Sequence, residues 1–276
     1  MKPIELPVRF GLVGTGGVAN LHLPAFRAQP EVARLVAVAD VRPEAARAYA
    51  DKLPPPVGTF SDYRAMVDPT LIDAAIIALP HHLHFPVAKD FLEAGIPTLV
   101  EKPLTCTLDE TRQLREIAAA RGVPLVVGQM RRFNPDAVWL HRWVRDDPQN
   151  FGELHSFDLH SWQNVLGYIN PSQGSGHWIL DAKRAGGGVV ISLAVHQLDL
   201  VRFITGLDFA EVTARGRFDP PFYNGAESSA SVLFTLSNGA SGVLHASYTA
   251  PRVPYSEGMS LFGEYGTIIQ HAEHIG

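Results

Sequence analysis

Cysteine is nearly absent from this sequence, because Cys106 is the only one among 276 residues. A single cysteine cannot form an internal disulfide, so a disulfide-stapled fold is excluded, and we expect Cys106 to be a small buried residue. Long apolar runs are missing as well, and none approaches the roughly eighteen residues of a membrane span. The first residues include Glu5 and two prolines and lack the apolar core of a signal peptide. We therefore expect a cytoplasmic protein with no membrane partner.

An excess of positive charge is also missing. Lys and Arg total 23 against 28 Asp and Glu, which gives a net charge of -5, and the basic residues are scattered. A nucleic-acid-binding protein usually shows a basic stripe or patch, so we expect no nucleic-acid partner. Apolar residues make up 46% of the chain, and its length is sufficient for two domains with buried cores. This composition is typical of an enzyme that acts on a small molecule.

The first half of the chain alternates between strand and helix patterns. Strand-like runs near 8–13, 33–40, 72–79, 97–101 and 124–128 are separated by helical stretches such as 43–53 and 108–122. The second of these helices begins with a capping box, Thr107 and Glu110, and ends at Gly122. Such alternation predicts an α/β domain with a mostly parallel sheet, over residues 1–130.

After about residue 150 the period of the pattern changes. A helix is expected from 188 to 205, followed by strands at 209–218, 228–236 and 240–249. The last two strands are joined across Asn238-Gly239, a strong hairpin signal. We therefore predict a second domain, 131–276, of the α+β class with a largely antiparallel open sheet.

A glycine-rich motif follows the first predicted strand and leads into a helix: Gly14-Thr15-Gly16-Gly17-Val18-Ala19. In a dinucleotide-binding fold these glycines permit the tight turn and the approach of the pyrophosphate, and a small residue at the last position lets the helix pack on the strand. A glycine turn without a ligand is the alternative, and the strand, helix and later acid around the motif argue against it.

The second predicted strand ends in Asp40, which can accept hydrogen bonds from the adenosine ribose and repel a 2′-phosphate. This favours NAD. Arg42, two residues later, could pair with that phosphate, so NADP stays open.

Lys102 lies where the fourth predicted strand, 97–101, ends, in Glu101-Lys102-Pro103. Parallel sheets bind ligands beyond the carboxyl ends of their strands, and Pro103 stops the strand there. The two interpretations are a catalytic lysine and a surface lysine after a strand. The glycine motif upstream favours the catalytic lysine.

A second constellation lies in the second domain, where Gly186-Gly187-Gly188 precedes Ser192, His196 and Asp199. On a regular helix these three side chains share one face. A histidine can relay a proton near neutral pH, and Asp199 could fix its tautomer. The helix is too apolar for a solvent-facing stripe, so we expect a buried polar cluster, either catalytic or structural.

Taken together, these motifs resemble the Gfo/Idh/MocA family of NAD(P)-dependent oxidoreductases, over nearly the whole chain. The resemblance implies a Rossmann domain and a substrate domain whose open sheet often forms an oligomer interface. It implies hydride transfer between the nicotinamide and a secondary alcohol of a sugar, inositol or related polyol, with Lys102 binding the hydroxyl and moving its proton and His196 as its partner in the relay. The cofactor-binding residues expected are Gly14, Thr15, Gly16, Gly17, Val18, Asp40, Arg42, Leu79, Pro80, His84, Glu101 and Lys102, and the substrate-binding residues are Lys102, Arg131, Arg132, Ser192 and His196.

The chain departs from the family pattern in three places. Ser192 stands where the family commonly has Asp, so a Lys-Asp-His relay is incomplete. Leu79-Pro80-His81 replaces the usual Thr-Pro-Asn. The sequence stops at Gly276, where relatives usually continue, and we expect either a naturally short or a truncated member. These departures keep a non-catalytic NAD-binding sensor open. An NAD-dependent glycoside-cleaving enzyme is a separate alternative.

Three histidines lie close together at His81, His82 and His84, but no matching Cys or carboxylate set accompanies them. We therefore expect no metal site.

Overall fold

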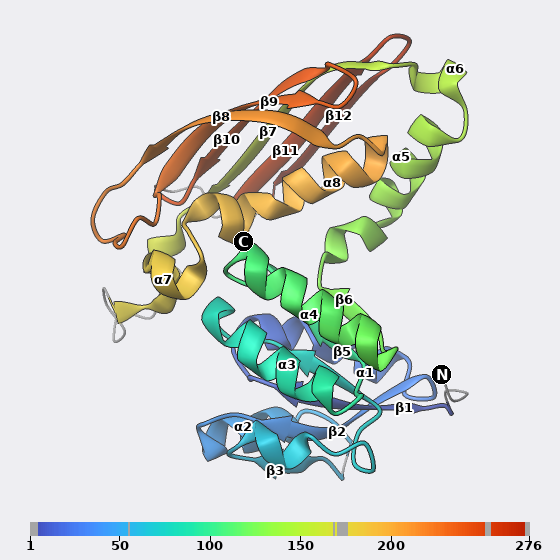
Figure 1. Cartoon of the computed structure of the whole chain (residues 1–276), viewed down its shortest axis with the longest axis vertical. Coiled ribbons are helices and arrows are strands. Elements are labelled where there is room, and N and C mark those ends of the chain that lie inside the picture. Colours follow the sequence, from blue (N-terminus) through green and yellow to red (C-terminus); the bar gives the residue numbers. More distant parts are fainter. Residues whose placement is uncertain (1–4, 55, 168, 170–175, 252–254, 274–276) are drawn as a thin grey trace. The chain divides into compact units, whose positions relative to one another are not determined.

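The computed structural model describes residues 5–54, 56–167, 169, 176–251 and 255–273. Its contacts divide the chain into two compact units, Met1–Gly128 and Gln129–Gly276. The division falls close to the boundary expected near residue 130, and the ribbon of both units is drawn in Figure 1.

Unit 1 is built on a parallel six-stranded sheet in the order β3-β2-β1-β4-β5-β6. This is the strand order of a Rossmann fold, and the predicted α/β class is confirmed. The strands are β1 Val8–Val13, β2 Ala33–Ala39, β3 Gly58–Phe60, β4 Ala74–Ile77, β5 Thr98–Val100 and β6 Leu125–Val127. The sequence pattern did not predict β3, because three residues at the sheet edge are too few to show a period.

The helices of unit 1 connect these strands. Those of α type are α1 Leu23–Ala28, α2 Pro43–Ala50, α3 His84–Glu93 and α4 Leu108–Arg121, and the 3-10 turns are η1 Val18–His22, η2 Tyr63–Met66 and η3 His81–Leu83. The capping box of α4 is confirmed, since Thr107 accepts from the Glu110 amide and Gly122 ends the helix with φ of 66°.

Alternate residues of the central strands fill two separate cores of unit 1. Leu12 and Ile76 belong to one cluster of buried side chains, whereas Val13 and Ile77 belong to another. Successive side chains of a strand point to opposite faces, so both faces of this sheet are buried. The buried sheet holds its strand ends, and the segments that follow them, in fixed positions.

Unit 2 contains a mixed six-stranded sheet in the order β12-β11-β7-β10-β9-β8, in which only the β7–β10 pair of the described strands is parallel. The predicted largely antiparallel sheet is confirmed. Asn238-Gly239 does join β9 and β10, with Gly239 at φ of 87°. The strands are β7 Leu154–Gln163, β8 Phe209–Arg217, β9 Ser229–Leu236, β10 Ser241–Ser247, β11 Tyr255–Gly263 and β12 Thr267–Glu273.

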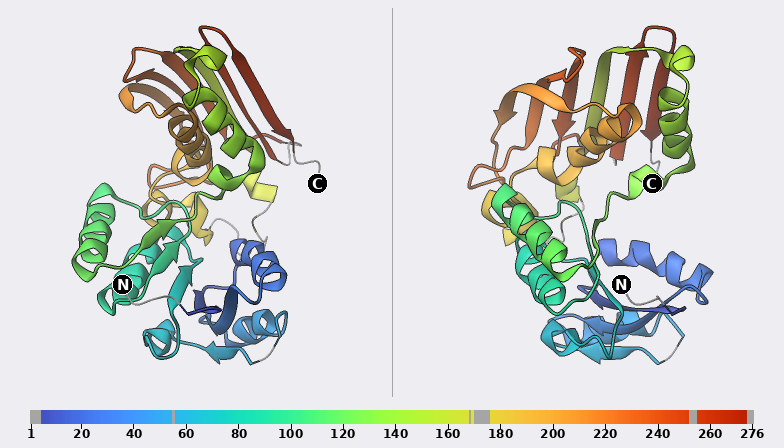
Figure 2. Two further views of the ribbon diagram at one scale, coloured as in Figure 1. Left: turned by 90° about the vertical axis from the view of Figure 1, so that its right-hand side faces the viewer. Right: turned by 45° about the vertical axis from the view of Figure 1, so that its right-hand side comes forward.

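One face of this sheet is covered by helix α8, Val195–Thr205, and no helix among the described residues of the unit lies over the opposite face (Figures 1 and 2). The other helical segments of unit 2 are η4 Met130–Phe133, α5 Pro135–Arg145, α6 Pro148–Phe151, η5 Val165–Gly167, η7 Trp178–Leu180, α7 Ala182–Ala185 and the π-helical turn η8 Val190–Ala194.

The helical stretch Ala182–Thr205 is long and apolar enough to cross a membrane by length and composition, and 56% of its apolar window is buried within the folded chain. Core helices of soluble proteins pass the same test, and its place against the sheet accounts for its apolar character.

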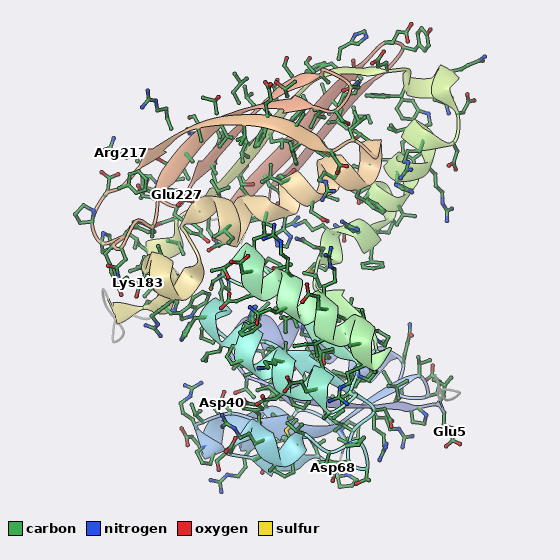
Figure 3. The ribbon with its side chains drawn as sticks, viewed as in Figure 1. Glu5, Asp40, Asp68, Lys183, Arg217 and Glu227 are labelled. Carbon is green, nitrogen blue, oxygen red and sulfur yellow. The ribbon has the colours of Figure 1, made fainter. Side chains whose placement is uncertain are left out.

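The start of this helix differs from the regular helix expected at 188. Glu227 accepts hydrogen bonds from the amides of Gly188, at 2.8 Å, and Val190, at 2.9 Å (Figure 3). A Cβ at Gly188 would lie 2.0 Å from the Glu227 carbonyl oxygen, so only glycine fits there. The glycine triplet therefore lets the helix begin directly against the segment that carries Glu227.

Candidate functional site

The strand ends of unit 1 form a continuous row. The amides of Gly14, Ala78, Glu101 and Gly128 donate to carbonyls of the neighbouring strands β2, β1, β4 and β5, respectively, over 2.8 to 3.0 Å. The segments after β1, β4, β5 and β6 thus lie side by side at one edge of the sheet. This is the edge where open α/β sheets bind ligands.

The glycines of the first motif have different roles. Gly14 has φ of 91°, and a Cβ there would lie 2.4 Å from the carbonyl oxygen of Ala78. Gly16 and Gly17 have nothing within 4 Å of an added Cβ, whereas Ala19 is fully buried in the core. Gly14 and Ala19 are therefore required by the fold itself. Gly16 and Gly17 leave open space before the amides of η1, which fits a pyrophosphate group.

Asp40, labelled in Figure 3, directly follows β2 and accepts several hydrogen bonds. Its Oδ2 accepts from the Thr15 hydroxyl at 2.6 Å and the Thr15 amide at 3.1 Å, and its Oδ1 accepts from the Arg42 amide at 3.0 Å. Burial works to raise the pKa of Asp40, but the hydrogen bonds from Thr15 and Arg42 outweigh it and hold the pKa below its usual value. The carboxylate is thus charged and oriented, as a ribose-binding residue must be.

Arg42 lies at the surface, and its Nε is 3.4 Å from Asp40 Oδ1. The guanidinium faces the aspartate beside it, so Arg42 serves first to hold Asp40. A contact of Arg42 with the cofactor stays a prediction.

Lys102 follows β5 and is half-buried. The neighbouring Glu101 is buried, and its Oε1 lies 3.0 Å from Nε2 of His22. A Cβ at Gly128 would lie 3.1 Å from Glu101 Oε2. Glu101 thus packs between the 3-10 turn η1, which contains His22, and Gly128 at the end of β6. It ties the segment that carries Lys102 to the proposed cofactor site.

His84 has no exposed surface. Its Nδ1 lies 2.8 Å from the carbonyl oxygen of Pro103, and its Nε2 lies 2.8 Å from that of Leu79. The ring thus joins the segment after β4, which includes Pro80, to the segment after β5. The sequence analysis placed His84 among the cofactor-binding residues, but full burial gives it no surface for a ligand. Its effect on the cofactor has to pass through these two segments.

Burial lowers the pKa of His84, although the two carbonyl groups and the charge of Glu101 act in the opposite direction. As the pH falls, the unfolded chain therefore takes up this proton before the folded chain does. The contribution of His84 to the free energy of unfolding is complete above about pH 6.5 and is lost below it, by up to about 1.4 kcal/mol per pH unit.

We expect His84→Gln to weaken this loss, so that urea unfolding at pH 7.5, 6.5 and 5.5 shows a shallower decline than in the wild type. The exposed His155 provides the control, since His155→Gln should leave the decline unchanged. Equal declines in the wild type and His84→Gln would contradict the assignment.

Unit 2 holds the second group of predicted residues. His196 is buried in α8, and its Nδ1 lies 3.2 Å from Oε1 of Gln129. Asp199 accepts two bonds from the guanidinium of Arg132, at 2.7 and 2.5 Å. The expectation that Asp199 fixes the tautomer of His196 is therefore wrong. Asp199 binds Arg132, and the side-chain amide of Gln129 contacts His196.

Ser192 is buried in the π-helical turn, and its hydroxyl interacts with that of the fully buried Tyr248. Because the turn is π-helical, the regular α-helical spacing assumed for Ser192 and His196 does not hold. A contact of Ser192 with substrate stays a prediction, as it does for His196.

Arg131 is enclosed in a buried group of side chains. Its guanidinium forms an ion pair with Glu257 and donates to the hydroxyl of Tyr255, which in turn donates to Glu257. Burial lowers the pKa of this arginine. Arg131 is thus largely committed to Glu257 and Tyr255, whereas Arg132 is more exposed. Of the two arginines, Arg132 has more surface for a substrate.

Comparison with known proteins identifies the family of this chain. The description "Oxidoreductase family, NAD-binding Rossmann fold" matches residues 8–129, and the Gfo/Idh/MocA C-terminal domain matches residues 142–269. The chain belongs to the Gfo/Idh/MocA family. It is therefore an NAD-dependent oxidoreductase with an NAD-binding Rossmann domain.

Two relatives of this Gfo/Idh/MocA protein are named inositol dehydrogenases. The inositol 2-dehydrogenase of Rhizobium meliloti is 27% identical over 95% of this chain and 75% of the relative. The scyllo-inositol 2-dehydrogenase (NAD(+)) of Bacillus subtilis is 28% identical over 90% of this chain and 69% of the relative. A structure of levoglucosan dehydrogenase in complex with NADH and levoglucosan is 25% identical, with a TM-score of 0.84 over 95% of this chain and 72% of that chain.

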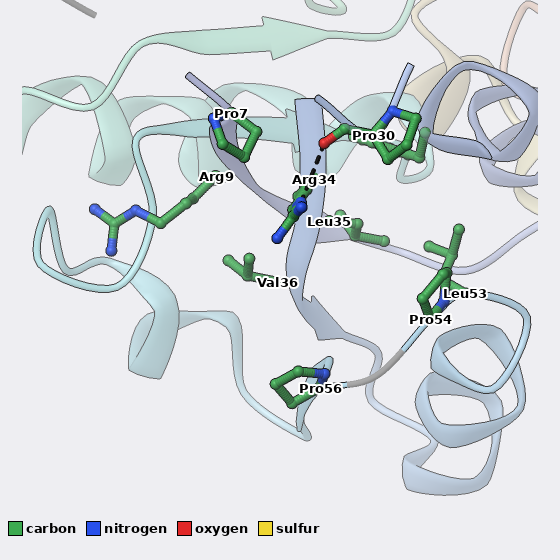
Figure 4. Close-up of a pocket in the computed structure, with 10 residues that line it drawn as sticks. Pro7, Arg9, Pro30, Arg34, Leu35, Val36, Leu53, Pro54 and Pro56 are labelled. Atoms are coloured by element: carbon green, nitrogen blue, oxygen red, sulfur yellow. Dashed lines mark hydrogen bonds between the residues drawn. The ribbon is translucent and has the colours of Figure 1, made fainter. Parts of the chain in front are cut away.

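One hollow among the described residues of this family member lies away from the predicted site. It measures about 540 Å³ and is lined mainly by apolar residues, among them Pro7 just before β1, Leu35 in β2 and Leu53 after α2 (Figure 4). The glycine motif follows the opposite end of β1, so this hollow does not belong to the NAD site. Among the described residues no group of His, Cys, Asp or Glu could hold a metal ion.

Cys106 is half-buried, and burial raises the pKa of its thiol to about 11. Such a thiol is protonated at neutral pH. Its partial exposure differs from the burial expected from the sequence.

Sequence reasoning missed the partners of the predicted residues in this Gfo/Idh/MocA chain. His22 pairs with Glu101 across 79 positions, Gln129 with His196 across 67, and Glu227 with Gly188 across 39. No short-range pattern connects residues so far apart. His22 could have been noticed by its place three residues after Ala19 in the motif helix.

Proposed function

We propose that this NAD-dependent oxidoreductase is a dehydrogenase that acts on a secondary alcohol of a sugar, inositol or related polyol. The observation that carries the proposal is the row of strand ends in unit 1. Lys102 follows β5 at the same edge where Gly16, Gly17 and the oriented Asp40 follow β1 and β2. The activities named for the inositol and levoglucosan dehydrogenases support this substrate class.

The reaction requires two transfers from the alcohol. Bound NAD supplies the acceptor for the hydride that leaves the carbinol carbon. The O–H bond of the same carbon breaks as its C=O bond forms, and the proton has to pass to a base within hydrogen-bond reach. We assign this proton to Lys102, with His196 as the second group of the relay. Asp40 holds the adenosine ribose and so favours NAD.

The experiment that tests the proposal is a spectrophotometric assay of NADH formation over sugars, inositols and sugar acids, with NAD and NADP binding measured beforehand. We expect NADH to form with one of these substrate classes and to be released from the protein. NAD binding without turnover on any of them would contradict the proposed substrate class. Product formation without net NADH release would instead indicate NAD-dependent glycoside cleavage.

We further propose that the protein is a homo-oligomer formed through the open face of the unit 2 sheet. Leu233, Val243 and Ile269 are exposed, and their strands are in register across this face through Asp158 and Ser260. A sheet face that exposes several apolar side chains in this way is typical of a protein interface.

Leu233→Lys combined with Val243→Lys is expected to yield monomers in size-exclusion chromatography with light scattering, because charged side chains oppose burial at an interface. Leu108, an exposed apolar residue of α4, provides the matched control as Leu108→Lys. A monomeric wild-type protein would contradict the proposal.

A further inference from the structure

The ring of His196 has a defined neighbour at one nitrogen. Its Nδ1 lies 3.2 Å from Oε1 of Gln129, the residue that immediately precedes η4, and α8 packs against η4. His196 is 8% exposed, so its ring is enclosed within unit 2 and the position of Gln129 matters for its orientation.

The two polar residues grouped with His196 in the sequence motif, Ser192 and Asp199, contact other side chains. Both oxygens of Asp199 accept from Arg132, and the hydroxyl of Ser192 interacts with Tyr248. The charged groups that flank His196 along α8 and η4, Asp199 and Arg132, thus form a pair with each other. At Nδ1 the histidine faces the uncharged amide of Gln129.

An amide oxygen accepts hydrogen bonds and does not donate them. A neutral imidazole that donates from Nδ1 carries its proton there, so its Nε2 holds a lone pair. We propose that Gln129 is the positioning residue of His196, which keeps the neutral ring in the tautomer whose Nε2 can accept a proton during alcohol oxidation. This inference rests on the proposed function, in which His196 belongs to the proton relay.

The amide has a chemical consequence that a carboxylate would not have. A carboxylate stabilises the imidazolium by its charge, whereas an amide orients the ring without that charge. Gln129 therefore provides orientation while leaving the ring neutral at lower pH than an Asp-His pair would. In this chain the amide performs the orienting part of the role of the aspartate that Ser192 replaces.

The activity test compares two substitutions of nearly equal size. In Gln129→Glu, the new carboxylate should move the acid limb of the kcat/KM profile for oxidation to higher pH by about one unit or more. In Gln129→Met, which has no acceptor oxygen, we expect kcat to fall about tenfold or more, with the Kd for NAD unchanged. Gln113 is exposed on α4, so Gln113→Glu adds the same charge as a control and should change neither quantity. An unshifted acid limb in Gln129→Glu would overturn the proposal.

The tautomer can be measured without any substrate. Nitrogen-15 NMR of the histidine side chains distinguishes Nδ1–H from Nε2–H rings, and His196→Gln assigns the signal by its loss. We expect the Nδ1–H form in the wild type and a mixture of both forms in Gln129→Met. A wild-type Nε2–H ring, or a tautomer unchanged in Gln129→Met, would overturn the positioning role. Failure of the proposed substrate class would leave this result intact, so the two failures are distinguishable.

Discussion

Replacement of Lys102 by methionine is expected to lower kcat for alcohol oxidation by about 10²- to 10⁴-fold, the usual contribution of a positioned acid–base group. The Kd for NAD should stay nearly unchanged, because the open glycine segment and Asp40 remain in place. Methionine preserves the length and the apolar stem of the side chain, so the loss would report the amine. The measurement is steady-state turnover on the best substrate together with calorimetric titration of NAD.

Two further variants complete this test. Lys102→Arg keeps the positive charge but cannot release a proton at working pH, so it should be nearly as inactive as Lys102→Met. Lys89 of α3, a partly exposed lysine near Glu93, provides the control as Lys89→Met and should keep full turnover. Turnover retained in Lys102→Met would remove the lysine from the mechanism and transfer its role to another group.

The second large effect concerns the choice of cofactor. Asp40→Ser should weaken NAD binding by about 10- to 100-fold, because charge-assisted hydrogen bonds contribute roughly 1.5–3 kcal/mol. The same change removes the charge that repels a 2′-phosphate and releases Arg42, so the affinity for NADP should rise. Titration of the variant with NAD and NADP measures both effects in the absence of substrate.

Thr15 provides an intermediate variant. Thr15→Val removes the 2.6 Å hydrogen bond to Asp40 but keeps its charge, so NAD affinity should fall by less than in Asp40→Ser. Asp51, an exposed aspartate just after α2, gives the control Asp51→Ser, which should leave both affinities unchanged. Equal loss of NAD and NADP affinity in Asp40→Ser would show that the aspartate does not discriminate between the cofactors.

Local features of the site were predictable from the sequence because each depends on neighbours in the chain. The turn at Gly14 needs a positive φ, the helix after it needs a small residue at 19, and the strand before Lys102 ends where the apolar run ends. Alternation of strands and helices then places Asp40 and Lys102 at one edge of a parallel sheet. Fold class, cofactor and family could all be predicted from these signals.

The exact partners of the site residues were not predictable in the same way. Asp199 lies one turn after His196 and was expected to contact it, yet Arg132 engages the aspartate from a distant segment. The helix also begins with a π-helical turn, and Glu227 accepts hydrogen bonds from amides at its start. Periodicity describes one helix and carries no information about what packs against it.

The sequence by itself thus determined the α/β class of unit 1, the NAD-binding motif and the position of Lys102 at a strand end, because these follow from short-range backbone geometry and apolar period. Only the tertiary structure decided that Gln129 faces His196, that His84 is buried between two carbonyl groups and that Arg131 is held by Glu257. Such pairings join segments far apart in the chain. They are decided by which buried polar groups meet when the cores form, and no local pattern encodes that.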